Sequence, residues 1–107
     1  MEIVVFVTTK NTAQAKKIAR GLLTKKLAAC VNILPGVQSL FWWQGKIDSA
    51  QESLLIIKST KARFQKLAQC VKALHGYQVP EIIALPIVAG NKEYLAWLQD
   101  SCSPKGE

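Results

Sequence analysis

The feature that most constrains the fold is residues 28–58, AACVNILPGVQSLFWWQGKIDSAQESLLIIK. This segment predicts two long β-strands joined at Trp43-Gln44-Gly45-Lys46, where Gly45 can supply the positive φ of a tight hairpin turn. At about 3.3 Å per residue, residues 28–43 would span roughly 50 Å as a strand. A helix of similar residue count, such as residues 11–26, spans only about 24 Å. Roughly half of the hairpin is therefore expected to project beyond any helical layer that covers its base.

The projecting half of the hairpin is apolar. Because side chains alternate along a strand, Leu40 and Trp42 point to one side of the ribbon. Phe41 and Trp43 point to the other side. Bulky apolar side chains on both faces of an unsupported ribbon are costly in water. We therefore predict that these four side chains form an oligomer interface with another copy of the chain.

Two further strands flank this hairpin in the sequence. Residues 3–9 form a continuous β-branched run, as expected for a strand buried on both faces. Residues 82–89 form a second apolar run, in which Pro86 favours an edge position or a bulge. Within the first arm of the hairpin, Pro35-Gly36 predicts a bulge or bend.

Apolar residues at helical spacing predict three helices. They begin after Asn11, after Ser59-Thr60 and after Asn91, all of which can cap a helix, and Gln14 can complete a capping box with Asn11. Gly76 is expected to end the second helix. The order is thus β-α-β-β-α-β-α, which predicts an α+β, ferredoxin-like split βαβ fold with an antiparallel sheet, a long protruding hairpin and both main helices on one face.

The length of 107 residues predicts one domain, residues 1–102, followed by a flexible tail at residues 103–107. No run approaches the ~18 apolar residues of a membrane span, and no signal-peptide pattern follows Met1. The three cysteines are an odd number without metal-ligand spacing, so we expect a reduced, cytoplasmic protein.

The chain is basic, with 14 Lys and Arg against 7 Asp and Glu. The cations of the two main helices fall on the sides opposite the apolar stripes. They therefore form either a solvated outer face or a surface for an anion or a nucleic acid. An RNA-binding sheet of this topology displays aromatic side chains on its central strands, and RNA bases stack on them. Nucleic-acid binding is disfavoured, because Phe6 is the only aromatic residue on the first strand.

The usual catalytic motifs are absent from the sequence. It has no phosphate-cradling glycine loop and no GxSxG elbow. An acylphosphatase-like enzyme would need an arginine after the first strand, where this chain offers only Lys10. These absences predict a protein that is not an enzyme.

One dense polar patch remains, formed by Cys30, Asn32, Lys58 and residues 75–81, HGYQVPE. His75 either caps the carbonyls of the preceding helix or ligates a metal with Tyr77 and Glu81 as neighbours. Cys30 is either a small core residue or a soft metal ligand. Lys58 is either a solvated edge charge or a binding group for an anionic ligand at a subunit cleft.

Several segments together resemble the CutA divalent-cation-tolerance family, in the family's order and from about residue 3 to residue 102. They are AACVNI at 28–33, PGV at 35–37, WQGK at 43–46, IKS at 57–59, HGY at 75–77, VPEI at 79–82 and YLAW at 94–97. The resemblance implies a cytoplasmic homotrimer, similar to the PII signalling proteins, that is linked to tolerance of copper and other divalent cations. No enzymatic reaction and no required cofactor are implied, although some members bind Cu(II).

The chain departs from the family pattern at three positions. Gly76 stands where the family usually has proline. Val7 and Leu74 occupy two positions at which some bacterial members have proposed copper ligands, a cysteine and a histidine, so only His75 is retained. The resemblance thus predicts weak Cu(II) binding unless three copies converge. Any ligand site is then expected in a cleft between subunits around Cys30, Asn32, Lys58, Tyr77 and Glu81, with His75 as the metal ligand. The alternative is a PII-like sensing module, in which Lys58 and the helix lysines hold an anion.

Overall fold

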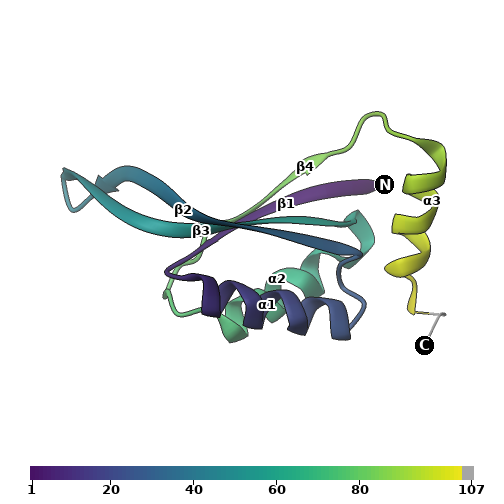
Figure 1. Ribbon diagram of the computed structural model, residues 1–107, viewed down its shortest axis with the longest axis horizontal. Helices are drawn as coiled ribbons and strands as arrows, with labels where there is room; N and C mark the ends of the chain where they lie inside the picture. Colours follow the sequence, from purple (N-terminus) through teal and green to yellow (C-terminus); the bar gives the residue numbers. More distant parts are fainter. Residues whose placement is uncertain (105–107) are drawn as a thin grey trace.

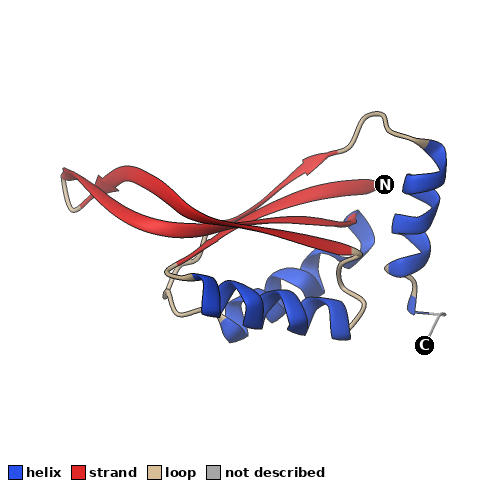
Figure 2. Ribbon diagram, in the orientation of Figure 1, coloured by secondary structure: helices blue, strands red, loops and turns tan. Residues whose placement is uncertain are grey.

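The computed structural model describes residues 1–104 and confirms the α+β, ferredoxin-like prediction. Four antiparallel strands lie in the order β2-β3-β1-β4, with α1 and α2 on one face and α3 across one end of the sheet (Figures 1 and 2). The elements are β1 Glu2–Thr9, α1 Thr12–Thr24, β2 Cys30–Trp43, β3 Lys46–Thr60, the 3₁₀ turn η1 Lys61–Arg63, α2 Phe64–Leu74, β4 Ile82–Pro86 and α3 Lys92–Ser101.

The predicted hairpin is formed by β2 and β3, which extend well past the helices (Figure 1). At its tip Trp43 pairs with Lys46, and the two turn residues, Gln44 and Gly45, have φ values of 50° and 78°. Positive φ at both central residues is the geometry of the tight turns that match the twist of paired strands. The predicted irregularity in the first arm is also confirmed, because the register shifts between Leu34 and Val37.

The core lies between the sheet and the two main helices. Alternate β1 residues, including Val5 and Val7, are fully buried on the helix side. They belong to one apolar cluster with Ile18 and Leu22 of α1 and with Leu67 and Val71 of α2. Full burial of such side chains contributes about 1.5–3 kcal/mol each, so this face fixes how the helices pack on the sheet.

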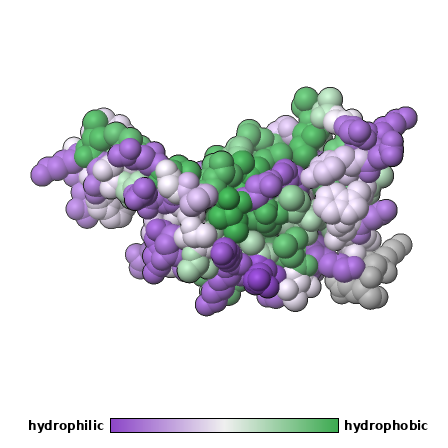
Figure 3. Space-filling view, in the orientation of Figure 1, coloured by the Kyte–Doolittle hydropathy of each residue, from purple (hydrophilic) through white to green (hydrophobic). Residues whose placement is uncertain are grey.

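The opposite face of the sheet is apolar and lacks such a helical layer in the part of the chain that the structure describes. We call it the open sheet face: Val4, Phe6, Leu34, Leu54, Ile56, Ile83 and Leu85. Ile83 is 52% exposed and Leu85 51%. Apolar residues gather across the middle of the molecule in Figure 3, and another apolar group lies at the hairpin tip. Exposed apolar area of this kind marks an interaction surface.

Several boundaries differ from the sequence prediction. β4 ends at Pro86 instead of residue 89, as expected for an edge strand whose proline lacks an N–H. α2 is preceded by η1, where Thr60 makes no side-chain capping bond. The extended backbone of His75 ends α2, and Gly76 does not adopt a left-handed conformation.

The capping prediction for α1 is half right. Asn11 Oδ1 accepts a hydrogen bond from the Gln14 backbone N–H at 2.8 Å. Gln14 does not complete the capping box, since its Oε1 has no hydrogen-bond partner among the described residues. At the other end of the chain Cys102, which directly follows α3, is buried. The predicted flexible tail lies partly outside the described residues.

Candidate functional site

The first polar cluster lies on adjacent strands at the α3 end of the sheet. Cys30 of β2 and Lys58 of β3 are register partners, and Asn32 lies two residues along β2, so all three side chains share the face that α1 and α2 leave uncovered. Lys58 Nζ donates a hydrogen bond to Asn32 Oδ1 and lies 4.0 Å from Cys30 Sγ. Cys30 Sγ is 3.9 Å from Asn32 Oδ1. The structure therefore brings together three of the predicted site residues.

A fourth residue, Tyr94 of α3, joins this cluster although the sequence analysis did not select it. Burial raises the pKa of the Tyr94 hydroxyl, and electrostatic and hydrogen-bonding interactions with Cys30 add to the shift. Tyr94 also contacts Trp97, with ring centroids 5.4 Å apart. Its place within the YLAW segment was the only signal in the sequence, because nothing there showed that α3 brings Tyr94 close to Cys30.

His75 belongs to a second cluster. Its Nδ1 accepts a hydrogen bond from the Tyr77 backbone N–H at 3.0 Å, so the ring proton lies on Nε2. His75 Nε2 then donates to the carbonyl of Thr8, at the end of β1, at 2.7 Å. His75 therefore links the chain after α2 to β1, and the predicted cap on the helix carbonyls is wrong. Both nitrogens are engaged, so a metal ion could bind only by displacing one partner.

Tyr77 connects His75 to a buried carboxylate. The tyrosine hydroxyl donates to Glu52 Oε2 at 2.9 Å, and Glu52 is only 8% exposed. The His75 and Tyr77 rings lie 4.9 Å apart. Glu52 thus takes the place beside Tyr77 and His75 that the sequence analysis gave to Glu81, which is exposed. The available signal for Glu52 was its position close before the apolar run of residues 54–57.

The two clusters lie apart within one chain. Lys58 pairs with Val4 of β1, whereas His75 binds the carbonyl of Thr8. Four residues of strand correspond to about 13 Å, so one subunit does not assemble the single patch that the sequence suggested. Within residues 1–104, no group of three His, Cys, Asp or Glu side chains could hold a metal ion. The donor set of one chain therefore does not fit a tight metal site.

The Tyr77–Glu52 contact predicts a pH effect. Burial, followed by the hydrogen bond and the charge of Glu52, raises the Tyr77 pKa from 10.0 to about 12. Above about pH 10 the unfolded chain loses a proton that folded Tyr77 keeps, so this contribution to stability declines as the pH rises towards 12. In Tyr94→Phe protein, Tyr77 is the only tyrosine, and its absorbance titration at 295 nm should have a midpoint near 12. A midpoint near 10 in the folded protein would contradict the contact.

These observations define a ferredoxin-like α+β protein with two polar clusters and a largely uncovered apolar sheet face. Residues 3–101 match the family model of the CutA1 divalent ion tolerance protein, and the chain belongs to this family. The solved structure of the divalent cation tolerance protein from Thermus thermophilus is 51% identical, with a TM-score of 0.93, and the match covers 94% of this chain and 98% of that one.

Other relatives differ in length and in the cellular location that their names give. A structure named periplasmic divalent cation tolerance protein CutA, from Archaeoglobus fulgidus, is 43% identical with a TM-score of 0.93, and the match covers 96% of this chain and 100% of that one. Protein CutA 1, chloroplastic, from Oryza sativa is 50% identical over 99 residues, which is 92% of this chain. The chain spans only 56% of the length of that rice relative. None of the helices within residues 1–104 has the length and apolar character needed to cross a membrane.

Proposed function

We propose that the protein is a homotrimer that acts in tolerance of divalent metal ions, copper included, without catalysing a reaction. Family membership supports the metal-tolerance role. The observation that supports a trimer is that one protomer exposes two apolar surfaces, the open sheet face and the hairpin tip. A cytoplasmic setting accords with three cysteines that are all unpaired. No resident cofactor is required by this proposal.

Assembly would also explain why the polar clusters lie apart. The Cys30–Asn32–Lys58 cluster lies beside the open sheet face, and the Tyr77–Glu52 pair lies near the base of the projecting hairpin. If neighbouring subunits meet along this face, the first cluster of one subunit can lie close to the second cluster of the next. The ligand cleft, with Glu81 at its rim, would then belong to the interface between subunits.

Copper binding in this protein is proposed to be weak and to depend on His75. Cu(II) favours imidazole nitrogen, and His75 is the only histidine in the chain. The His75 lone pair already accepts the Tyr77 N–H, so binding must break that bond at a cost of about 0.5–1.5 kcal/mol. Cys30 is the nearest soft donor on the open side of the sheet, but it belongs to the other cluster.

Calorimetric titration with Cu(II) tests the metal part of the proposal. His75→Ala is expected to weaken binding by about tenfold or more, the effect of losing one ligand from a weak site. Lys72→Ala, an exposed change on α2, serves as the control and should bind like wild type. If wild type and His75→Ala bind alike, His75 is not a copper ligand.

A second candidate function is a PII-like module that senses a small anion. It is favoured by Lys58, whose hydrogen-bond partners in the described structure, Asn32 and Cys30, are not carboxylates. An ammonium group without a carboxylate partner is suited to an anionic ligand. Binding of an anion that is lost in Lys58→Gln protein would support this candidate, and the same variant serves in the experiment below.

A further inference from the structure

The charges of this protein are unevenly distributed, because the helical layer carries most of the cations and the rest of the chain carries all of the acids. Residues 10–26 and 61–72, which make up most of the helical layer, contain six and four of the 14 Lys and Arg, and none of the seven acidic residues. The remaining parts of the chain hold four Lys and all seven acids. The helical face therefore carries a strong positive potential that no carboxylate of α1, η1 or α2 offsets.

A surface pocket of about 420 Å³ lies between the helices on this face. Three cations line it: Lys25, which follows α1, and Arg63 and Lys66, at the start of α2. Its floor includes the buried side chains of Leu27 and Cys70, and no acidic residue among those described lines it. A volume of this size falls within the range of small-molecule sites, which typically combine an apolar lining with a few charged groups.

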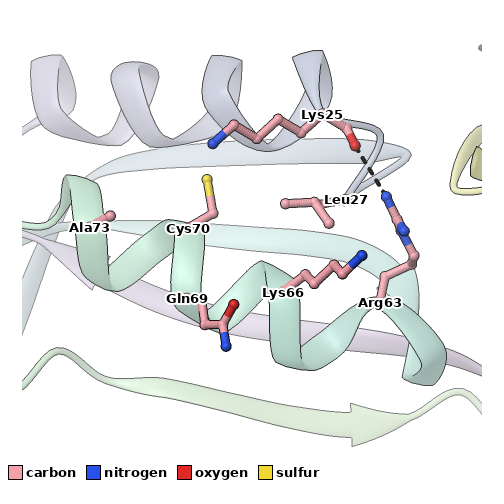
Figure 4. A pocket seen from close by; sticks show the side chains of 7 residues that line it. All are labelled: Lys25, Leu27, Arg63, Lys66, Gln69, Cys70 and Ala73. Atoms are coloured by element: carbon pink, nitrogen blue, oxygen red, sulfur yellow. Dashed lines mark hydrogen bonds between the residues drawn. The ribbon is translucent and has the colours of Figure 1, made fainter.

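Figure 4 shows how the cations are arranged. The Lys25 side chain runs along α1 towards the Cys70 end of the pocket, and the Lys66 side chain runs along α2 towards Arg63. Arg63 is held in place, because its guanidinium donates to the backbone carbonyls of Lys25 at 3.2 Å and Lys26 at 3.3 Å. The pocket thus has one fixed guanidinium at one end, with the Lys66 ammonium beside it and the Lys25 ammonium towards the other end.

This arrangement raises the free energy of the protein without a ligand. Like charges that line one concave surface repel one another. The first turn of α2 contains no acidic residue, and Arg63 and Lys66 lie where the helix dipole disfavours positive charge. A bound anion would reduce both the repulsion between these cations and their unfavourable interaction with the helix dipole.

We propose that this pocket binds a phosphate-bearing small molecule. A phosphate group carries about two negative charges and several acceptor oxygens, which suits one guanidinium and two ammonium groups better than a single carboxylate would. The pocket lies on the helical side of the sheet, opposite the Lys58 cluster, so this site is separate from the proposed subunit cleft. It therefore goes beyond the metal-tolerance proposal.

The test is calorimetric titration of the full chain with inorganic tripolyphosphate and with ATP at roughly 0.15 M salt, where diffuse surface charge is screened. Lys25→Gln/Lys66→Gln is expected to weaken binding by at least about tenfold, since two charge-assisted hydrogen bonds are lost. Lys16→Gln/Lys72→Gln removes the same net charge from exposed positions of α1 and α2 outside the pocket, and should change affinity less than about twofold.

Three results would overturn the proposal. Equal losses in the two double variants would mean that charge over the whole helical face, suited to a long polyanion, is responsible for binding. Loss of binding in Lys58→Gln protein would mean that the anion binds in the subunit cleft and not in this pocket. Absence of binding by wild type at millimolar tripolyphosphate and ATP would remove the site altogether. The Cu(II) titration of His75→Ala is independent of all three results.

Discussion

Trp42→Ala protein is expected to dissociate into monomers at concentrations where the wild type remains assembled. Trp42 is 72% exposed in the protomer and Trp43 59%, on opposite sides of a ribbon that extends past the helices. If a neighbouring subunit buries Trp42, truncating this side chain should cost about 3–5 kcal/mol per contact. Each 1.4 kcal/mol is a factor of ten in an equilibrium constant, so the loss is large enough to measure.

Sedimentation velocity over a dilution series measures this effect. Val88→Ala is the matched control, because Val88 is apolar and 92% exposed but lies in the loop between β4 and α3, away from the hairpin. The control should dissociate like wild type. Equal dissociation of all three proteins would show that the hairpin tip is not an assembly contact.

A charge on the open sheet face should have a comparably large effect. Ile83 of β4 pairs with Phe6 of β1, and both side chains face away from the core. If this face is covered by other subunits, Ile83→Asp places an unpaired carboxylate in an apolar interface, at a cost of about 3–5 kcal/mol per subunit. We therefore expect a folded monomer.

Circular dichroism separates loss of assembly from loss of folding in this experiment. Val88→Asp introduces the same charge at an exposed position outside the open sheet face and should leave assembly unchanged. An Ile83→Asp protein that stays assembled would show that the sheet face is not covered by a second copy. The hairpin and the sheet face are thus tested independently.

The fold could be predicted because its main determinants are local in sequence. Strand rise and helix rise alone require the hairpin to outgrow the helical layer, and the turn at Gln44-Gly45 follows from backbone geometry. The cap at Asn11 and the edge position of Pro86 likewise depend on neighbouring residues. Such features depend mainly on residues that are close in the sequence.

The candidate site could be predicted only in part, because its contacts join distant parts of the chain. The pairing of Cys30 with Lys58 follows from hairpin register. The contact of Tyr77 with Glu52 depends on where the loop after α2 meets the sheet, and the contact of Tyr94 with Cys30 depends on how α3 packs across its end. No periodicity or motif spacing encodes those positions, so Glu52 and Tyr94 were missed.

The boundary of α2 shows the same limitation on a smaller scale. Gly76 was expected to end the helix in a left-handed conformation, as glycine often does. Instead, His75 leaves the helix with an extended backbone, and its ring binds Thr8 of β1. The end of α2 is therefore determined by the contact of His75 with β1 and not by the glycine that follows it.

The central claim is that the exposed hairpin and the open sheet face are covered by two further copies of the chain. Light scattering of the wild-type protein at micromolar concentration tests it most directly. We predict a particle of about 35 kDa, three times the 11.8 kDa of one chain. A particle of 11.8 kDa at that concentration would contradict it.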